Sequence, residues 1–202
     1  DNELKNLNID YKICAYNDGS KDNTSEILHE LEKQYPNLQA VDKSNSGHGP
    51  TILRGYRECA EKFDWIFQID SDNEMHADGF KQLWDKRNEY DFLIGKRNNR
   101  IQALPRKIIS LVSRISIKLF YGTKGPYDVN SPYRLMKSSV FKDLFNKIPD
   151  DTFAPNVIIS GYTARKALKV YETPVNCELR TTGEVSIKKW KLLKAAVKSF
   201  CQ

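Results

Sequence analysis

Three clusters of polar residues, each placed just after a short apolar run, are the residues of this 202-residue chain best suited to chemistry. They are Asn17-Asp18-Gly19-Ser20, Asn45-Ser46-Gly47-His48-Gly49 and Asp70-Ser71-Asp72-Asn73-Glu74. Ligands of open parallel sheets bind outside the carboxyl ends of the strands. We therefore expect the three clusters to face one binding site.

The third cluster is suited to a divalent cation. Asp70 and Asp72 follow the apolar run DWIFQID and are separated by one residue, so their carboxylates can converge on one ion. Carboxylate oxygens suit Mg²⁺ or Mn²⁺, which often complete their coordination with substrate phosphates. Alone, this spacing is also typical of a solvated loop or a helix cap. Its position at a strand end, beside two other polar turns, favours the metal site.

The first two clusters each have a functional and a structural interpretation. Asp18 can accept a hydrogen bond from the N–H of a nucleobase, or it can belong to a turn that leads into the next helix. The glycines of the second cluster can let a nucleotide diphosphate approach the backbone and a helix N-terminus, or they can serve the loop alone. His48 is a polar loop histidine, a type that is usually exposed.

Short apolar runs that alternate with amphipathic stretches predict an α/β fold with a mostly parallel sheet flanked by helices. Strands are expected at residues 9–17, 38–42, 64–70, 91–95, 131–137 and 167–179, the last an edge strand interrupted by Pro174. Helices are expected at 22–34, from the glycine-rich turn to residue 60, around 80–84, and at 105–120, 138–145, 156–162 and 186–200. We find no linker or repeat that divides the chain.

The net charge of +6 is unevenly distributed. Residues 1–93 hold 11 basic and 19 acidic side chains, whereas residues 94–124 hold 8 basic and no acidic ones. The acidic first half suggests a cation site, and the basic segment 94–124 suggests an anionic partner. Charged side chains that only solvate a helix face would explain any single patch equally well. No apolar run approaches the roughly 20 residues that cross a bilayer. The 4 cysteines form no CxxC pair, which is typical of reduced thiols in the cytoplasm.

Together, these motifs resemble family 2 glycosyltransferases of the GT-A fold, particularly the dolichyl-phosphate mannose synthase-like branch. The similar segments, in the order of that family, are NDGSKDNT, SNSGHGPTILRGY, IDSDNE, GKRNNR, DVNSPYRLM and ETPVNCELRTTGEVSI. They extend over nearly the whole chain. Members of the family begin with a further strand, whereas this sequence opens in what looks like the end of the following helix. The resemblance therefore implies a GT-A fold that either lacks its usual first strand or is represented by a fragment of a longer chain.

The resemblance also implies a role for individual residues. The metal ion, Mg²⁺ or Mn²⁺, would be held by Asp70, Asp72 and Glu74, the last at a position where this branch often carries a Gln. The donor would be bound by Asp18, through its base, and by Gly19, Ser20, Asn45, Gly47, Gly49, Asp70 and Ser71. The acceptor would be bound by Arg97, Arg106, Arg180 and Ser186, and the catalytic residues would be Asp72, Arg134 and Arg180. Arginine suits such positions because its planar fork meets phosphate oxygens bidentately.

The implied function is inverting, metal-dependent transfer of a sugar from a nucleotide diphosphate sugar to a polyprenyl phosphate or glycan acceptor. One domain, residues 1–202, would comprise a donor and metal half (1–93) and an acceptor half (94–202). Many relatives carry an Asp base where this chain has Asn156, and an amide cannot act as a base. A phosphate acceptor, which is already anionic, needs none.

Two alternatives belong to other classes. One is a non-catalytic sugar-nucleotide-binding or membrane-surface module. The other is a basic nucleic-acid-binding domain, which the basic segment disfavours because its aromatic residues are only Phe120 and Tyr121, at its end. We expect no nucleic acid partner. The Lys-rich helix at 186–200 can dock on its own domain or lie on an anionic bilayer, and we expect peripheral attachment to the cytoplasmic face of the membrane.

Overall fold

The computed structural model describes residues 1–98 and 125–177. Its strands are β1 (Ile13–Asn17), β2 (Leu38–Asp42), β3 (Trp65–Gln68), β4 (Phe92–Asn98), β5 (Arg134–Lys137) and β6 (Val170–Asn176). Its helices are α1 (Asn2–Asn6), α2 (Thr24–Gln34), α3 (His48–Ala60), the 3-10 turn η1 (Ala77–Gly79), α4 (Phe80–Lys86), α6 (Ser138–Lys147) and α7 (Pro155–Arg165). Each element expected within these residues is present, and α1 confirms that the chain opens in a helical segment. The helices expected at 105–120 and 186–200 lie outside the described residues.

The described strands form two sheets, a pair β1-β2 and a four-stranded sheet in the order β3-β5-β4-β6. The pairs β1-β2 and β4-β6 are parallel, as the sequence predicts, but β5 runs antiparallel to both of its neighbours. An apolar run does not encode the direction of its strand, so the sequence pattern could not reveal this reversal. The α/β architecture itself is confirmed.

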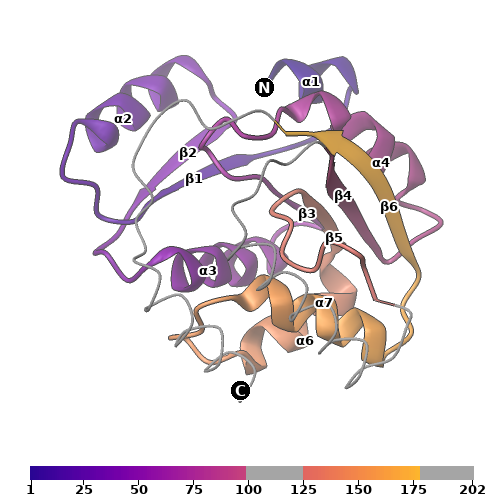
Figure 1. The fold of residues 1–202 in the computed structure, drawn as a ribbon. Coiled ribbons are helices and arrows are strands. Elements are labelled where there is room, and N and C mark those ends of the chain that lie inside the picture. Colours follow the sequence, from indigo (N-terminus) through magenta and orange to yellow (C-terminus); the bar gives the residue numbers. More distant parts are fainter. Residues whose placement is uncertain (99–124, 178–202) are drawn as a thin grey trace.

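Helices cover both faces of the strands, with α1, α2 and α4 on one side and α3, α6 and α7 on the other (Figure 1). Strand β4 lies between two hydrophobic cores because successive side chains of a strand point to opposite faces. Phe92 and Ile94 pack in the core with α3, α6 and α7, and Leu93 packs in the core with α4. Each core contains residues from both expected halves of the chain, 1–93 and 94–202, so the two halves fold around shared cores.

The edge strand β6 continues through Pro174, which pairs with Lys96 of β4. The expected interruption at this proline is therefore wrong. Proline lacks only a backbone donor, and an edge strand can tolerate that loss on its outer side.

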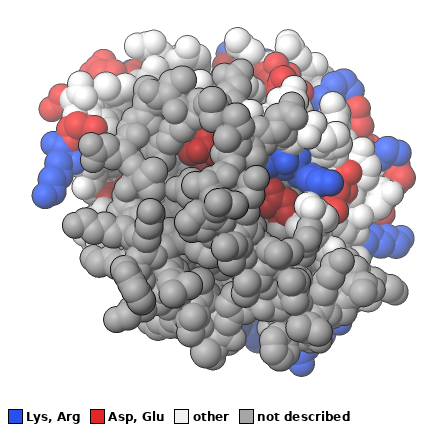
Figure 2. Space-filling model, viewed as in Figure 1, with Lys and Arg blue, Asp and Glu red and all other residues white. Residues whose placement is uncertain are grey.

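Several exposed charges on the described surface are paired. Acidic and basic side chains lie next to one another on the side of the molecule that carries α4 (Figure 2). There Lys81 bonds Asp85 at 2.6 Å and Lys86 bonds Glu89 at 2.9 Å. Among the residues described here, no helix is long and apolar enough to cross a membrane.

Helix α3 begins in close contact with the loop before α7. A Cβ atom added to the buried Gly49 would lie 2.3 Å from the carbonyl oxygens of Thr152 and Phe153. We expected the missing side chain of Gly49 to leave room for a nucleotide diphosphate. In the structure, backbone carbonyl groups of the protein itself occupy that space. This contact anchors the first turn of α3.

Replacing Gly49 with Ala should lower the free energy of unfolding by about 3 kcal/mol, because two backbone carbonyls would have to move. Urea denaturation measures the change. The matched control is Ser44→Ala at an exposed position of the same loop, which should stay within about 0.5 kcal/mol of the wild type. A Gly49→Ala protein as stable as the wild type would contradict the packing role.

Candidate functional site

Asp18 joins the first two polar clusters. Its Oδ1 accepts a hydrogen bond from the N–H of Ser46 at 2.9 Å, and its Oδ2 accepts one from the N–H of Gly47 at 2.8 Å. The side-chain amide of Asn45 donates to the Asp18 carbonyl at 2.8 Å. The loops after β1 and β2 therefore lie together at one end of their sheet, as the sequence predicts.

Lys43 completes this junction from the end of β2. Its ammonium group forms an ion pair with Asp18 and donates to the hydroxyl oxygens of Ser46 at 2.6 Å and Thr51 at 3.2 Å. Its side chain is only 10% exposed. The sequence analysis did not single out Lys43, but parallel pairing of Asn17 with Asp42 places the next residue of each strand, Asp18 and Lys43, side by side. The register of β1 and β2 was the missing signal.

The carboxylate of Asp18 is strongly held in its ionised form. Partial burial raises its pKa, but hydrogen bonds from Lys43 and from the N–H groups of Ser46 and Gly47 outweigh that effect and lower it to about 2. Both oxygens thus serve the protein's own loops. The contacts favour the structural interpretation of Asp18, and its contact with a nucleobase stays a prediction.

Gly19 lets the two loops approach each other. Its φ of +69° lies in the left-handed region, and an added Cβ would lie 2.7 Å from the backbone nitrogen of Asn45. Ser20 follows at the surface, where its N–H donates to Oδ1 of Asn17 at 3.1 Å. Ser20 and Asn45 are exposed, so both are open to a ligand at this edge.

The third cluster lies beside the start of α3. Nε2 of His48 is 3.8 Å from Oδ2 of Asp70, which links the loop after β3 to the glycine-rich turn. Burial raises the pKa of Asp70, and the nearby charge of Asp72 raises it further. A cation would relieve both effects by stabilising the ionised carboxylates. The adjacent Ser71 is exposed.

The carboxylates of Asp70 and Asp72 fit a metal ion that is shared with a substrate. Oδ1 of Asp70 accepts a hydrogen bond from Gln68 at 3.1 Å, and Oδ1 of Asp72 accepts one from the N–H of Glu74 at 3.1 Å. The second oxygen of each carboxylate accepts no hydrogen bond from a described residue, and Oδ2 of Asp70 lies 3.8 Å from Nε2 of His48. Two carboxylates leave most coordination positions to phosphate and water, as is usual for Mg²⁺.

Glu74 is the third residue that was expected to hold the metal ion. In the part of the chain that the structure describes, no three His, Cys, Asp or Glu side chains are grouped as a metal site. The loop turns at Asn73, whose φ is +57°, and the negative charge of Glu74 acts on Arg97. The role of Glu74 as a third metal ligand stays a prediction.

Arg97 lies close to the site but already has a partner. Its Nε and Nη2 each donate to a carboxylate oxygen of Asp128 at 2.7 Å, and its side chain is 9% exposed. Its positive charge lowers the pKa of Asp70, so the two groups are near one another. An acceptor phosphate would have to compete with Asp128 for this guanidinium.

Arg134 is buried in the core, with 0% of the residue exposed. Its guanidinium donates to the carbonyl oxygens of Ser131 at 2.6 and 2.9 Å, of Asn156 at 3.1 Å and of Val129 at 3.4 Å. Burial lowers its pKa. We expected Arg134 to act on a substrate phosphate, but this geometry gives it a structural role behind the site. The other predicted acceptor residues, Arg106, Arg180 and Ser186, lie outside the described residues.

A buried group of hydrogen bonds supports Asp70 from behind. The Tyr56 hydroxyl contacts Oε1 of Gln68 and donates to Oδ1 of Asn156 at 2.7 Å, and the Asn156 amide donates to Oε1 of Gln68 at 3.0 Å. The other end of Gln68 donates to Asp70. Sequence reasoning missed Tyr56 and Gln68, although an amide inside the apolar run WIFQ was a visible signal.

Replacing Asp18 with Asn should lower the free energy of unfolding by about 2 kcal/mol at pH 7, because the carboxylate is stabilised in the folded state. Since its folded pKa lies below its unfolded value, that stabilisation is complete above about pH 4 and is lost toward about pH 2. Urea denaturation at pH 7 and about pH 3 should therefore show a smaller difference in acid. The control is Asp10→Asn, an exposed carboxylate before β1. Unchanged stability combined with weaker nucleotide binding would instead favour a base contact.

Comparisons with known proteins identify sequences that are similar to this chain. The Pyrococcus furiosus dolichol-phosphate mannosyltransferase is 28% identical over 93% of this chain and 53% of its own length. The dolichyl-phosphate beta-glucosyltransferase ALG5A of Trichomonas vaginalis is 26% identical over 86% of this chain and 56% of its own length. The chain thus spans about half the length of these two relatives.

Solved structures show the same fold. Glucosyl-3-phosphoglycerate synthase from Mycobacterium tuberculosis has a TM-score of 0.59 at 12% identity, covering 94% of this chain and 66% of that protein. S. aureus TarS 1-349 in complex with UDP has a TM-score of 0.54 at 17% identity, covering 98% of this chain and 59% of that protein. These likenesses establish the GT-A fold. The sequence matches the family described as Glycosyl transferase family 2 over residues 2–145, and the chain therefore belongs to that family.

Proposed function

We propose that this chain transfers a sugar, with inversion, from a nucleotide diphosphate sugar to a polyprenyl phosphate, using Mg²⁺ or Mn²⁺. The observation that carries the proposal is the meeting of three polar loops at the ends of β1, β2 and β3. They are joined by the contacts of Asp18 with Ser46 and Gly47 and of Asp70 with His48. A glycan acceptor remains the second candidate.

The donor would lie across these three loops. Ser20, Asn45 and the N-terminal turn of α3 would face the nucleotide, and Asp70 and Asp72 would hold the metal ion on its diphosphate. A bound divalent ion supplies charge stabilisation for the departing diphosphate. Gln68 and the N–H of Glu74 orient the two carboxylates, so that their free oxygens can point to the ion.

The state of Asn156 supports a phosphate acceptor. Its side-chain amide is 4% exposed and hydrogen-bonded to Tyr56 and Gln68, so it neither faces a substrate nor can remove a proton. A phosphate oxygen attacks without a base because it is already anionic. The lipid phosphates that give two relatives their names, dolichyl phosphate and dolichol phosphate, are acceptors of this chemical kind.

Replacing Asp70 or Asp72 with Asn should weaken metal-dependent binding of the donor roughly 100-fold, because each change removes one of two charged ligands. Calorimetric titration of a panel of nucleotide sugars, with Mn²⁺ and with EDTA, measures this effect on the full chain. The matched control is Asp78→Asn, an exposed carboxylate after the same loop. Wild-type binding that is equal in Mn²⁺ and EDTA would contradict the metal site.

We also propose that the Lys-rich segment at residues 186–200 attaches the enzyme to an anionic membrane surface, where a lipid-linked acceptor resides. Its five lysines, from Lys188 to Lys198, support this proposal because each basic residue near such a surface contributes about 1 kcal/mol. Co-sedimentation with vesicles should require anionic lipid and decrease at high salt. Binding that ignores both lipid charge and salt would contradict it, as would no binding at all.

A further inference from the structure

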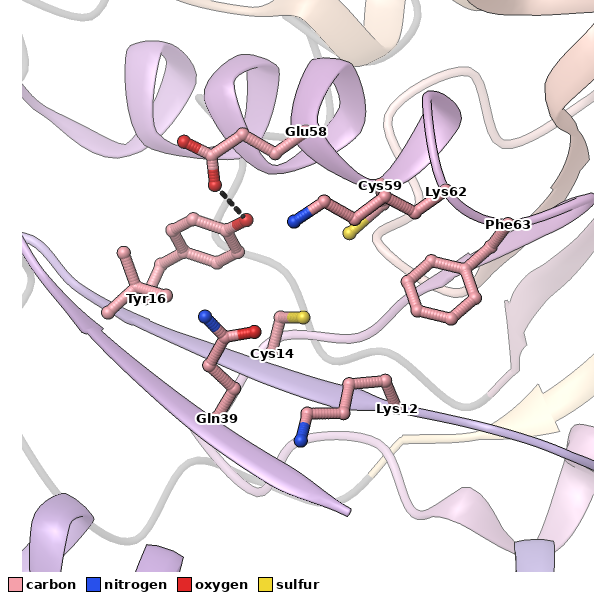
Figure 3. A pocket seen from close by; sticks show the side chains of 9 residues that line it. Lys12, Cys14, Tyr16, Gln39, Glu58, Cys59, Lys62 and Phe63 are labelled. Atoms are coloured by element: carbon pink, nitrogen blue, oxygen red, sulfur yellow. Dashed lines mark hydrogen bonds between the residues drawn. The ribbon is translucent and has the colours of Figure 1, made fainter.

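A cavity of about 240 Å³ lies between the β1-β2 pair and α3, away from the loops that form the donor site. Alternate residues of β1 and of the segment before it, Lys12, Cys14 and Tyr16, line its strand side. Cys59 and Lys62, from the end of α3 and the turn after it, line the other side. Figure 3 shows the two sulfur atoms facing each other across this space.

Helix α3 lies close against β1 at this point. A Cβ on Gly55 would lie 3.1 Å from the ring of Tyr16, and the Tyr16 hydroxyl donates to Glu58 at 2.7 Å. Cys59 is the next residue of the helix, and Cys14 is on the same face of the strand as Tyr16. The two contacts of Tyr16 therefore set the thiols opposite each other across the cavity.

The surroundings of Cys14 favour its thiolate. The neighbouring Cys59 thiol and the positive charges of Lys12 and Lys62 lower the pKa of Cys14 to about 7, against the opposing effects of burial and Glu58. The neighbouring Cys14 sulfur, together with burial, raises the pKa of Cys59. Both residues are partly exposed, so a small reagent in the cavity can reach them.

We propose that Cys14 and Cys59 form a redox-active thiol pair that closes a disulfide between β1 and α3. Cys14 is the attacking thiol and Cys59 the resolving thiol. The oxidant is a low-molecular-weight anionic disulfide of the glutathione class, which the two lysines attract. This inference does not depend on the proposed transferase function.

The reaction balances as two exchanges. The Cys14 thiolate attacks one sulfur of the small disulfide, which forms a mixed disulfide and releases one small thiolate. The Cys59 sulfur then attacks the Cys14 sulfur, releases the second small thiolate and passes its proton to it. The Cys14 thiolate and the Cys59 thiol are oxidised together to one protein disulfide, and the small disulfide is reduced to one thiolate and one thiol.

The test is to incubate the full reduced chain with glutathione disulfide, alkylate the remaining thiols, and map the peptides without reduction. We expect a peptide that links Cys14 to Cys59, while Cys177 stays alkylated. In Cys59→Ser the reaction should stop at a glutathione adduct on Cys14, and Cys14→Ser should give neither adduct nor link. Lys62→Ala should slow the first exchange several-fold.

The wild-type map decides the question even if a cysteine variant fails to fold. No linked peptide after complete reaction of the glutathione disulfide would overturn the proposal. A link that involves Cys177, or an adduct that forms first on Cys59, would overturn it as well. Treating the linked protein with dithiothreitol should restore both free thiols, and failure to do so would exclude a reversible pair.

Discussion

The buried hydrogen bonds among Tyr56, Gln68 and Asn156 are the constraint on which the site depends. They tie α3, β3 and α7 together in the core, where each polar group would cost about 1–3 kcal/mol if left without a partner. Because Gln68 uses its other end to hold Asp70, the position of the carboxylate follows from the packing of three elements. Buried hydrogen bonds thereby hold the protein side of the predicted metal site in place.

A second junction, between Asp18 and Lys43, organises the other half of the site in the same way. Ionised groups at the ends of two parallel strands satisfy each other and the loop N–H groups, so the donor loops are shaped before any ligand arrives. Preorganised loops lose less conformational entropy when they bind. Both junctions use polar residues for architecture, and one of these residues, Asp18, was expected from the sequence to contact the substrate.

The sequence could predict the elements and the location of the site, but not the structural roles of single polar residues. The order and type of the described elements, and the meeting of the three clusters, followed from apolar periodicity and from the rule that sites form at strand ends. The interior position of Arg134 did not follow. The sequence around an arginine in a strand is the same whether its guanidinium binds buried carbonyl groups or a substrate phosphate. The surroundings of Gly49 depend on the loop at 152–153, which is far away in the sequence. The position of Glu74 depends on the backbone conformation of Asn73, which the residue types alone do not fix.

Pro174 has a consequence for how the molecule behaves at high concentration. Among the described strands β6 is the last of its sheet, and an uncovered strand edge is a template on which another chain can add a strand. Pro174 is exposed and has no N–H, so it interrupts the row of donors that such an intruder would need. The residue that was expected to break the strand instead leaves the strand intact and guards its outer side against edge-to-edge aggregation.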